Sequence, residues 1–318
     1  MTTVRLARAS GSAFGVDDIS CAAATQLGLF KAQGLDVQWS DWRGGVAASK
    51  AALEGKVDVA YAGFGPVVAL RAEGRPCRIF VSQARGLAQA LVVRSSIKDA
   101  SSLKKKTWAV DGIGALSHHM ARLVVRALQI PERDIEWLAV GPPPERIKAL
   151  LQGRVDASLI RTEEALALHR DHADKVRRLL DFDELKKLVP LQPHGVLMTT
   201  EAYERAHPDV LLALAKAMIL ASRALHDDFA TFAAVAKGCI AVALSDAELR
   251  LLWEREHSSG GWAVNGELTR GHWQAQLALW RELNPGSRAV TRDELIAERF
   301  VPEALAVIGV HPTRFDQP

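Results

Sequence analysis

Short apolar runs of strand length alternate with helical segments along most of this chain, and this alternation limits its fold more than any other feature. The strands predicted in the first part of the chain are Val4–Ala9, Asp36–Trp42, Val57–Ala62, Arg78–Ser82 and Ala90–Arg94. Chains in which strands alternate with helices form α/β folds with largely parallel sheets. The sequence therefore predicts an α/β fold.

A second series of similar segments begins near Ser95. It contains predicted strands at Thr107–Val110, Ile135–Val140 and Val155–Ile160, with helices at Leu116–Leu128 and Glu145–Gln152. One further strand, Gly195–Thr199, is followed by predominantly helical sequence to the end of the chain. A length of 318 residues also suits two domains. We expect two α/β units, and the pattern leaves open whether the second is inserted within the first.

Composition and the length of the apolar segments argue against three classes of protein. Hydrophobic residues make up 48% of the chain, enough apolar surface to offset the chain entropy of a disordered polypeptide. The formal charge is +3, and the dense basic run Lys104–Lys106 is typical of a solvated turn, so we do not expect a nucleic-acid partner. The most apolar predicted helix, Val210–Leu225, contains Lys216 and Arg223 and is too short to cross a bilayer.

The termini and the cysteines bear on the cellular compartment. No signal peptide is visible after Met1, so we expect either a cytosolic protein or one from which an export signal was removed. Cys21, Cys77 and Cys239 form an odd and scattered set, which indicates free thiols rather than disulfides or a structural zinc site.

A glycine-containing loop follows the strand at Thr107–Val110 and precedes a helix. Gly112-Ile113-Gly114-Ala115-Leu116-Ser117 approaches a dinucleotide-binding fingerprint, but Ser117 replaces its third glycine. Free N–H groups at the start of a helix favour an anion, and Ser117 and His118 add side-chain donors. We expect this loop to contact an anionic or polar ligand. A plain tight turn and a nucleotide cofactor remain the alternatives.

Other reactive side chains have ordinary explanations. His169 and His172 stand three apart among charged residues, which favours a solvated face over a metal site. Cys21 lies near the start of a helix, where a thiolate is stabilised, but no partner is placed beside it, and we expect it to be dispensable. Trp42 and Phe64 follow predicted strands, where they either wall a pocket or fill the core. We expect no metal and no cofactor.

Several short motifs, each weak by itself, occur in the same order along this chain as in a known family, and the chain resembles that family. Gly28–Val37 is similar to a recurrent stretch of type II periplasmic solute-binding proteins of ABC transporters, in the nitrate, sulfonate, taurine and thiamine-pyrimidine-precursor group. The further matching segments are Arg43–Gly45, Glu54–Ala60, Gly63–Pro66, Arg71–Gly74, Ser102–Lys104 and Gly153–Ala157. Together these cover most of residues 4–200 and, more weakly, the C-terminal helices.

The resemblance implies a two-lobe fold with two crossovers and a ligand cleft between mostly parallel sheets. Lobe one would be residues 1–90 with 195–318, and lobe two residues 91–194. It implies a non-enzymatic, monomeric receptor that delivers a small anionic organic molecule, such as a sulfonate, carboxylate or heterocyclic acid, to an ABC permease. The location would be periplasmic after signal removal and cytoplasmic if Met1 is the native start. The alternative is a cytosolic enzyme on the same fold that acts on an aromatic or heterocyclic acid, as a desulfinase or pyrimidine synthase does.

The expected ligand-binding residues lie at or after the ends of predicted strands, at the start of the helix Leu116–Leu128, or next to the Gly195–Thr199 strand. They are Ser10, Ser12, Phe14, Trp42, Arg43, Gly44, Gly63, Phe64, Arg85, Ser117, His118, Arg161, Thr162 and His194.

Arg161 is expected to be the main anion contact. It ends the last strand predicted for lobe two, so its guanidinium is expected to grip a carboxylate or sulfonate with two hydrogen bonds. Arg85 is the expected partner from the opposite wall, with Arg43 a weaker one. The alternative is a surface ion pair between Arg161 and Glu163 or Glu164.

Overall fold

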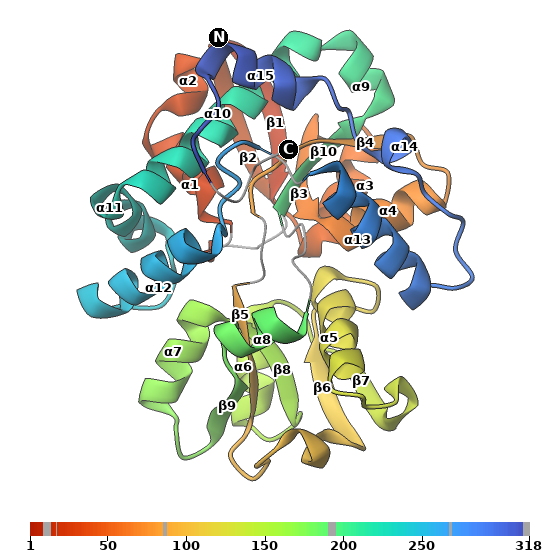
Figure 1. Cartoon of the computed structure of the whole chain (residues 1–318), viewed down its shortest axis with the longest axis vertical. Coiled ribbons are helices and arrows are strands. Elements are labelled where there is room, and N and C mark those ends of the chain that lie inside the picture. The colour runs from red at the N-terminus through yellow and green to blue at the C-terminus, as the bar shows by residue number, and fades with distance from the viewer. Residues whose placement is uncertain (9–13, 17, 85–87, 190–194, 267–268, 314–318) are drawn as a thin grey trace.

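The computed structural model describes residues 1–8, 14–16, 18–84, 88–189, 195–266 and 269–313. It contains two five-stranded sheets with helices on both faces, one above the other in Figure 1. We call the first sheet with its helices lobe one and the second sheet with its helices lobe two. The first sheet contains β1 (Thr2–Arg8), β2 (Leu35–Asp41), β3 (Val59–Gly63), β4 (Cys77–Ser82) and β10 (Gly195–Thr200). The second contains β5 (Gln89–Arg94), β6 (Lys106–Val110), β7 (Ile135–Ala139), β8 (Ala157–Arg161) and β9 (Val176–Leu180).

The helices fall into three groups along the chain. The N-terminal group is α1 (Ile19–Gln26), α2 (Leu29–Ala32), α3 (Gly44–Leu53) and α4 (Phe64–Ala72). The helices of lobe two are α5 (Leu116–Ala127), α6 (Pro143–Leu151), α7 (Thr162–Asp171) and α8 (Phe182–Leu188), with short 3₁₀ turns at Ala100–Leu103 and Glu132–Asp134. The C-terminal group is α9 (Glu201–Ala206), α10 (Pro208–Asp227), α11 (Phe229–Cys239), α12 (Asp246–Ser259), α13 (Arg270–Leu283), α14 (Arg292–Leu295) and α15 (Phe300–Ile308).

Both sheets have the same strand topology. The first runs β2-β1-β3-β10-β4 and the second runs β7-β6-β8-β5-β9. In each sheet the first three strands of the order are parallel, and the fourth is antiparallel to both of its neighbours. That fourth strand, β10 or β5, is the one that follows a crossing from the other lobe. The predicted α/β fold is therefore confirmed. The lobe boundaries at 90/91 and 194/195 stay a proposal, and β5 begins at Gln89, ahead of the first of them.

Two details differ from the sequence prediction. β9 and the helices on either side of it, α7 and α8, were not predicted. β9 reads Val-Arg-Arg-Leu-Leu and only Val176 in it is fully buried, so the strand carries a weak apolar signal. Arg161 accordingly ends β8, which is not the last strand of lobe two. In lobe one, α1 and α2 are separated at Gly28, whose φ of +67° suits a glycine.

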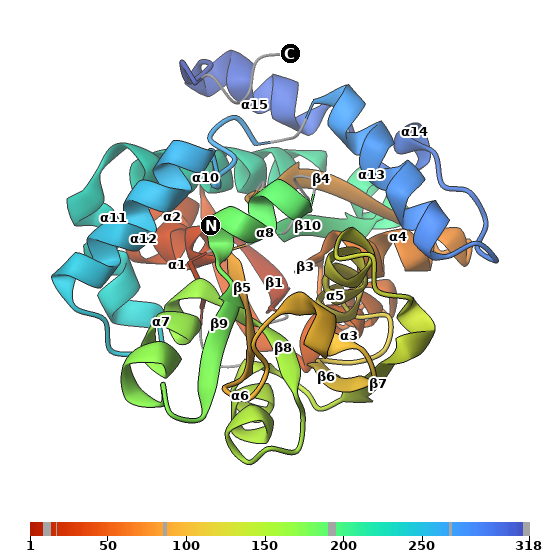
Figure 2. The ribbon, with the colours of Figure 1, turned by 60° about the horizontal axis from the view of Figure 1, so that its bottom comes forward.

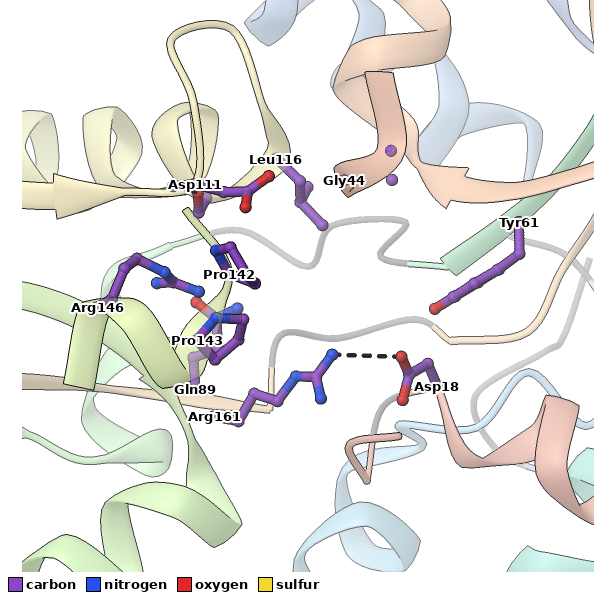
Figure 3. A pocket seen from close by; sticks show the side chains of 13 residues that line it. Asp18, Gly44, Tyr61, Gln89, Asp111, Leu116, Pro142, Pro143, Arg146 and Arg161 are labelled. Atoms are coloured by element: carbon purple, nitrogen blue, oxygen red, sulfur yellow. Dashed lines mark hydrogen bonds and ion pairs between the residues drawn. The ribbon is translucent and has the colours of Figure 1, made fainter. Parts of the chain in front are cut away.

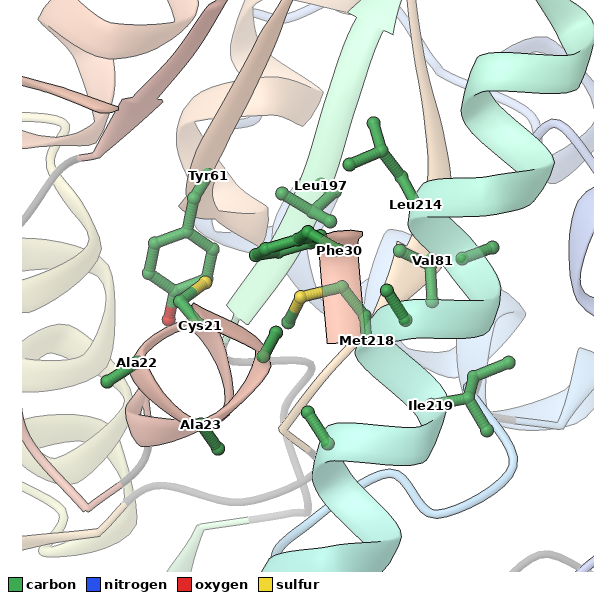
Figure 4. Close-up of a cluster of buried hydrophobic side chains, with 14 of the residues drawn as sticks. Cys21, Ala22, Ala23, Phe30, Tyr61, Val81, Leu197, Leu214, Met218 and Ile219 are labelled. Atoms are coloured by element: carbon green, nitrogen blue, oxygen red, sulfur yellow. The ribbon is translucent and has the colours of Figure 1, made fainter. Parts of the chain in front are cut away.

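Alternate side chains of each strand fill cores on opposite faces of the sheet. In β5, Leu91 and Val93 pack towards α5 and α8, whereas Ala90 and Val92 pack towards α6 and α7. In lobe one, α1 and α10 cover one face, and Figure 4 shows Leu197 of β10 among the side chains of this core. The other face carries α3, α4 and α13.

The C-terminal helices also contact lobe two. Figure 2 shows α12 beside α7 and α13 beside α5. Arg170 of α7 pairs with Glu248 of α12 at 3.1 Å, and Arg126 of α5 pairs with Glu282 of α13 at 2.7 Å. The two lobes are therefore joined by these salt bridges at their outer edges, in addition to the two chain crossings.

Leu197→Ala should destabilise the protein strongly, because Leu197 is fully buried between β3 and β4 and its loss leaves a cavity. We expect the free energy of unfolding, measured with urea, to fall by about 2–5 kcal/mol. Leu251→Ala is the matched control: its side chain is exposed on α12, and the change should stay within about 0.5 kcal/mol. Equal effects of the two substitutions would contradict this description of the core.

Candidate functional site

A cavity of about 110 Å³ lies between the two lobes, where the carboxyl ends of the parallel strands of both sheets meet (Figure 3). Open α/β sheets bind ligands at this edge. Lobe one contributes Asp18, Gly44, Gly45, Tyr61 and Gly63, and lobe two contributes Gln89, Asp111, Leu116, Ser117, Pro142, Pro143, Arg146 and Arg161. At roughly 15 Å³ for each water-sized group, the volume suits a small molecule and is far too small for a dinucleotide.

Two glycines allow the lobes to approach closely. A Cβ atom on Gly44, which has a φ of +82°, would lie 2.6 Å from the Asp111 carboxylate of lobe two. A Cβ atom on Gly63 would lie 2.9 Å from the Cβ of Leu116. A side chain at position 44 would displace the Asp111 carboxylate and would also be strained by the positive φ. A side chain at position 63 would meet the Cβ of Leu116, so glycine there permits the close approach of the two lobes.

Arg161 forms an ion pair with Asp18 across the cavity. Its guanidinium lies 3.4 Å from the Asp18 carboxylate, and the two side chains are only 13% and 3% exposed. Asp18 precedes α1 of lobe one, whereas Arg161 ends β8 of lobe two. Two buried charges lose much of their hydration, and the loss is offset only when they pair. The pair therefore links the lobes at the cavity wall, as the dashed line in Figure 3 shows.

Arg146 is the most deeply buried cation of the site. Its guanidinium donates to the hydroxyl of Ser158 and to the carbonyl of Leu159, and its Nε has no hydrogen-bond partner among the described residues. Burial lowers the pKa of Arg146 to about 10, while the carboxylates of Glu164 and Asp111 act in the opposite direction. The side chain therefore remains positively charged at neutral pH, and Arg146 is one of the residues that line the cavity.

Polar groups of both signs share this cavity with the two arginines. Burial raises the pKa of the Asp111 carboxyl, and the positive charges of Arg146 and Arg43 oppose that shift. The Oε1 of Gln89 is buried and has no hydrogen-bond partner in the part of the chain that the structure describes. The hydroxyl of Tyr61 points into the cavity in Figure 3. The site thus offers donors and acceptors to one small polar ligand.

The structure brings four of the predicted site residues together at the cavity, namely Gly44, Gly63, Ser117 and Arg161. The Ser117 hydroxyl accepts a hydrogen bond from the backbone N–H of Asp111 at 2.8 Å. Arg43 lies outside the lining, is largely exposed and pairs with Glu145 of lobe two at 3.1 Å. Ser10, Ser12, Arg85 and His194 lie outside the described residues.

Two predicted aromatic residues pack within the lobes instead. The ring of Phe64 is buried 5.7 Å from the ring of Trp273, in the core between α4 and α13. The imidazole of His118 accepts a hydrogen bond from the Gly114 N–H and lies 5.0 Å from the ring of Trp137. Both side chains complete apolar surfaces away from the cavity lining.

The remaining predicted residues also lie beside the cavity lining rather than in it. Trp42 donates from its indole N–H to Ser40. Thr162 is buried, and its backbone N–H bonds to the carbonyl of Ala88. Phe14 lies beneath the guanidinium of Arg8, which is 4.3 Å from the ring centroid.

Several lining residues were not predicted. Asp111 directly follows β6 and Pro142 follows β7, so their position after a parallel strand was the available signal. Arg146 lies within α6, and its helical context gave no sign that it faces the other lobe. Tyr61 lies inside β3, and only the alternation of strand side chains bears on its direction.

The position of Cys21 does not suit a nucleophile, because its thiol is buried away from the cavity. Its thiol is fully buried in the core of lobe one, beside the ring of Tyr61 in Figure 4, and donates to the Gln83 side-chain oxygen at 3.3 Å. Burial, reinforced by the charge of Asp18, raises the pKa of Cys21 far above its usual value. Cys21 is also absent from the cavity lining, which holds no cysteine or histidine among the described residues.

Residues 18–228 match the family described as NMT1/THI5 like. The chain belongs to this family. The match covers most of both lobes and confirms the family predicted from the sequence. None of the curated proteins compared with the chain matches it.

Solved structures of similar fold include three that cover nearly the whole chain. A protein from Bordetella bronchiseptica RB50 has a TM-score of 0.79 at 21% identity, covering 97% of this chain and 98% of its own. The alkanesulfonate-binding protein SsuA from Xanthomonas axonopodis pv. citri, bound to MOPS, has a TM-score of 0.70 at 21% identity, with 96% and 98% covered. The nitrate-binding protein NrtA from Synechocystis PCC 6803 has a TM-score of 0.75 at 14% identity, with 98% and 90% covered. These likenesses confirm the two-lobe fold of type II periplasmic binding proteins.

No helix among the described residues is long and apolar enough to cross a membrane.

The Cys21 thiol should resist alkylation in the folded protein, because only the thiolate attacks and burial suppresses its formation. Treatment with iodoacetamide at neutral pH, followed by peptide mass spectrometry, should show Cys21 reacting at least about 100-fold more slowly than in guanidinium-unfolded protein. The unfolded sample is the control for intrinsic reactivity. Rapid labelling of Cys21 in the native state would instead indicate an activated nucleophile.

Proposed function

We propose that this protein is the solute-binding component of an ABC importer and that it binds a small anionic organic molecule between its lobes. The observation that carries the proposal is Arg146, a buried cation at the inter-lobe cavity with an unsatisfied Nε donor. Buried donors are almost always hydrogen-bonded, and a buried charge needs a partner. A ligand carboxylate or sulfonate supplies both.

The charges around the cavity refine the expected ligand. Arg161 already faces Asp18, so Arg146 is the primary anion contact and Arg161 the second. The acceptor oxygens of Asp111 and Gln89 suit a ligand that carries a hydrogen-bond donor beside its anionic group. The small cavity volume favours a compact ligand. Two of the similar structures are those of an alkanesulfonate-binding protein and a nitrate-binding protein, and both of these ligands are anions.

Transport requires that the ligand favour one arrangement of the lobes. The lining comes from both lobes, and Arg161–Asp18 and Arg43–Glu145 join them around the cavity. A ligand that contacts both walls stabilises the closed arrangement by its differential affinity for it. The permease then distinguishes the loaded receptor from the empty one. We propose that the receptor acts as a monomer with such a permease partner, in the periplasm when an export signal precedes this sequence.

The alternative of an enzyme on the same fold has less support. An enzyme would differ from a receptor in having a nucleophile or base in the cavity. Cys21, the candidate nucleophile, lies in the core instead, where its pKa is strongly raised. The anion-binding arrangement of Arg146 accounts for the site without a chemical step.

A thermal-shift screen of sulfonates, carboxylates and heterocyclic acids should identify ligands, because a molecule that binds only the native state raises its melting temperature. Calorimetric titration of the best ligand against Arg146→Lys and Arg161→Ala should then show weaker binding. The loss of a buried charge-assisted contact costs about 2–4 kcal/mol, or roughly 30- to 1,000-fold in affinity.

Arg154→Ala is the matched control, because Arg154 is an exposed arginine of the same lobe. Its affinity should stay within about twofold of the parent, as expected for a surface charge. Affinity within threefold of the parent for both Arg146→Lys and Arg161→Ala would remove the reason for an anionic ligand. Turnover of a screened compound, lost in Cys21→Ala, would favour the enzyme.

A further inference from the structure

Three side chains with metal-binding atoms meet on lobe one, outside the cavity lining. His226 and Asp227 end α10, and His311 belongs to the segment after α15. The Nδ1 of His226 and the Nε2 of His311 each lie 2.9 Å from the same oxygen of Asp227. One ligand atom from each residue lies within 4.8 Å of the others. Two imidazoles and a carboxylate thus converge from segments far apart in the sequence.

The segment that carries His311 is fixed in place by its backbone. The His311 N–H donates to the Asn265 side-chain oxygen at 2.8 Å, and the Asn265 amide donates back to the His311 carbonyl at 3.1 Å. Arg223 of α10 donates to the carbonyl of Gly309 at 2.7 Å. The imidazole of His311 is therefore held against the end of α10.

The ring of His226 is oriented by its neighbours. It stacks on His257 with ring centroids 4.2 Å apart, and His257 stacks in turn on Trp253 at 4.8 Å. The Nδ1 of His257 also bonds to the carbonyl of His226 at 3.0 Å. This stack holds the Nδ1 of His226 towards Asp227 and His311, so the three ligand atoms are arranged before anything binds.

We propose that His226, Asp227 and His311 form a binding site for a divalent transition metal of the Zn²⁺ type. Imidazole nitrogens and a carboxylate oxygen are ligands that zinc prefers, and bonds of about 2.0–2.2 Å to one ion bring such atoms roughly 3 Å apart. The two nitrogen–oxygen distances of 2.9 Å in the structure are already close to that value. The C-terminus of the twenty-residue helix α10 adds negative potential, which favours a cation there.

A metal at this site would tie the C-terminal segment to α10. His311 follows α15, which packs along α10 in the core of lobe one. Binding energy gained only in the folded state adds to its stability. The ion would therefore stabilise lobe one by cross-linking its C-terminal segment to α10, and it would leave the ligand cavity unchanged.

The test is a titration of metal-free protein with Zn²⁺ in competition with a chromophoric chelator at pH 7.5. The parent should bind one equivalent and gain thermal stability. His311→Ala and Asp227→Asn should each weaken Zn²⁺ binding by at least about tenfold, as the loss of a ligand requires. His172→Ala, which removes a histidine from another part of the surface, should bind Zn²⁺ like the parent.

Three results would overturn the proposal: no one-equivalent site in the parent, parent-like affinity in His311→Ala, or an equal loss in His172→Ala. A measurement on the unmodified protein covers the case in which a variant fails to fold. One equivalent of Co²⁺ should give visible absorption bands that Zn²⁺ abolishes. Their absence would likewise overturn the site.

Discussion

Each sheet of this protein is completed by a strand that has just crossed from the other lobe. β5 pairs with β8 and β9, and β10 pairs with β3 and β4, so backbone hydrogen bonds hold the strand that follows each crossing inside a sheet. This pairing directs the carboxyl ends of both sets of parallel strands towards one another. The cavity, its lining from both lobes and the ion pair across it all depend on that arrangement.

The two arginines of the inter-lobe cavity differ in their partners. Arg161 pairs with Asp18 of lobe one, whereas the hydrogen bonds of Arg146 to described residues go to Ser158 and Leu159 of its own lobe. A buried ion pair contributes little net stability, since desolvation consumes most of the attraction. The Arg161–Asp18 pair therefore serves better to set the orientation of the lobes than to hold them together.

Local patterns in the sequence predicted the strands and the family. The sequence says much less about which side chains point towards the opposite lobe. Apolar runs located nine of the strands, and the ordered motifs predicted the family, but β9 escaped because its two arginines dilute the apolar pattern. Gly44 and Gly63 were predicted as site residues from the family motifs, Ser117 from a helix start and Arg161 from a strand end, and all four line the cavity. Arg146 lay beyond such reasoning, because nothing local to α6 tells which residue of a helix meets the opposite lobe. The partner of Arg161 was likewise set by tertiary packing, since Asp18 is distant in sequence.

The place of β10 has a consequence for synthesis on the ribosome. β10 lies between β3 and β4, so the first sheet lacks an interior strand until Thr200 has been made. Every strand of the second sheet precedes that point. Lobe two is thus the first unit with a complete sheet, and the edges of β3 and β4 that face β10 stay unpaired while it emerges. A nascent chain of this topology exposes these two strand edges longest, which makes them the part of the first sheet most in need of protection from aggregation.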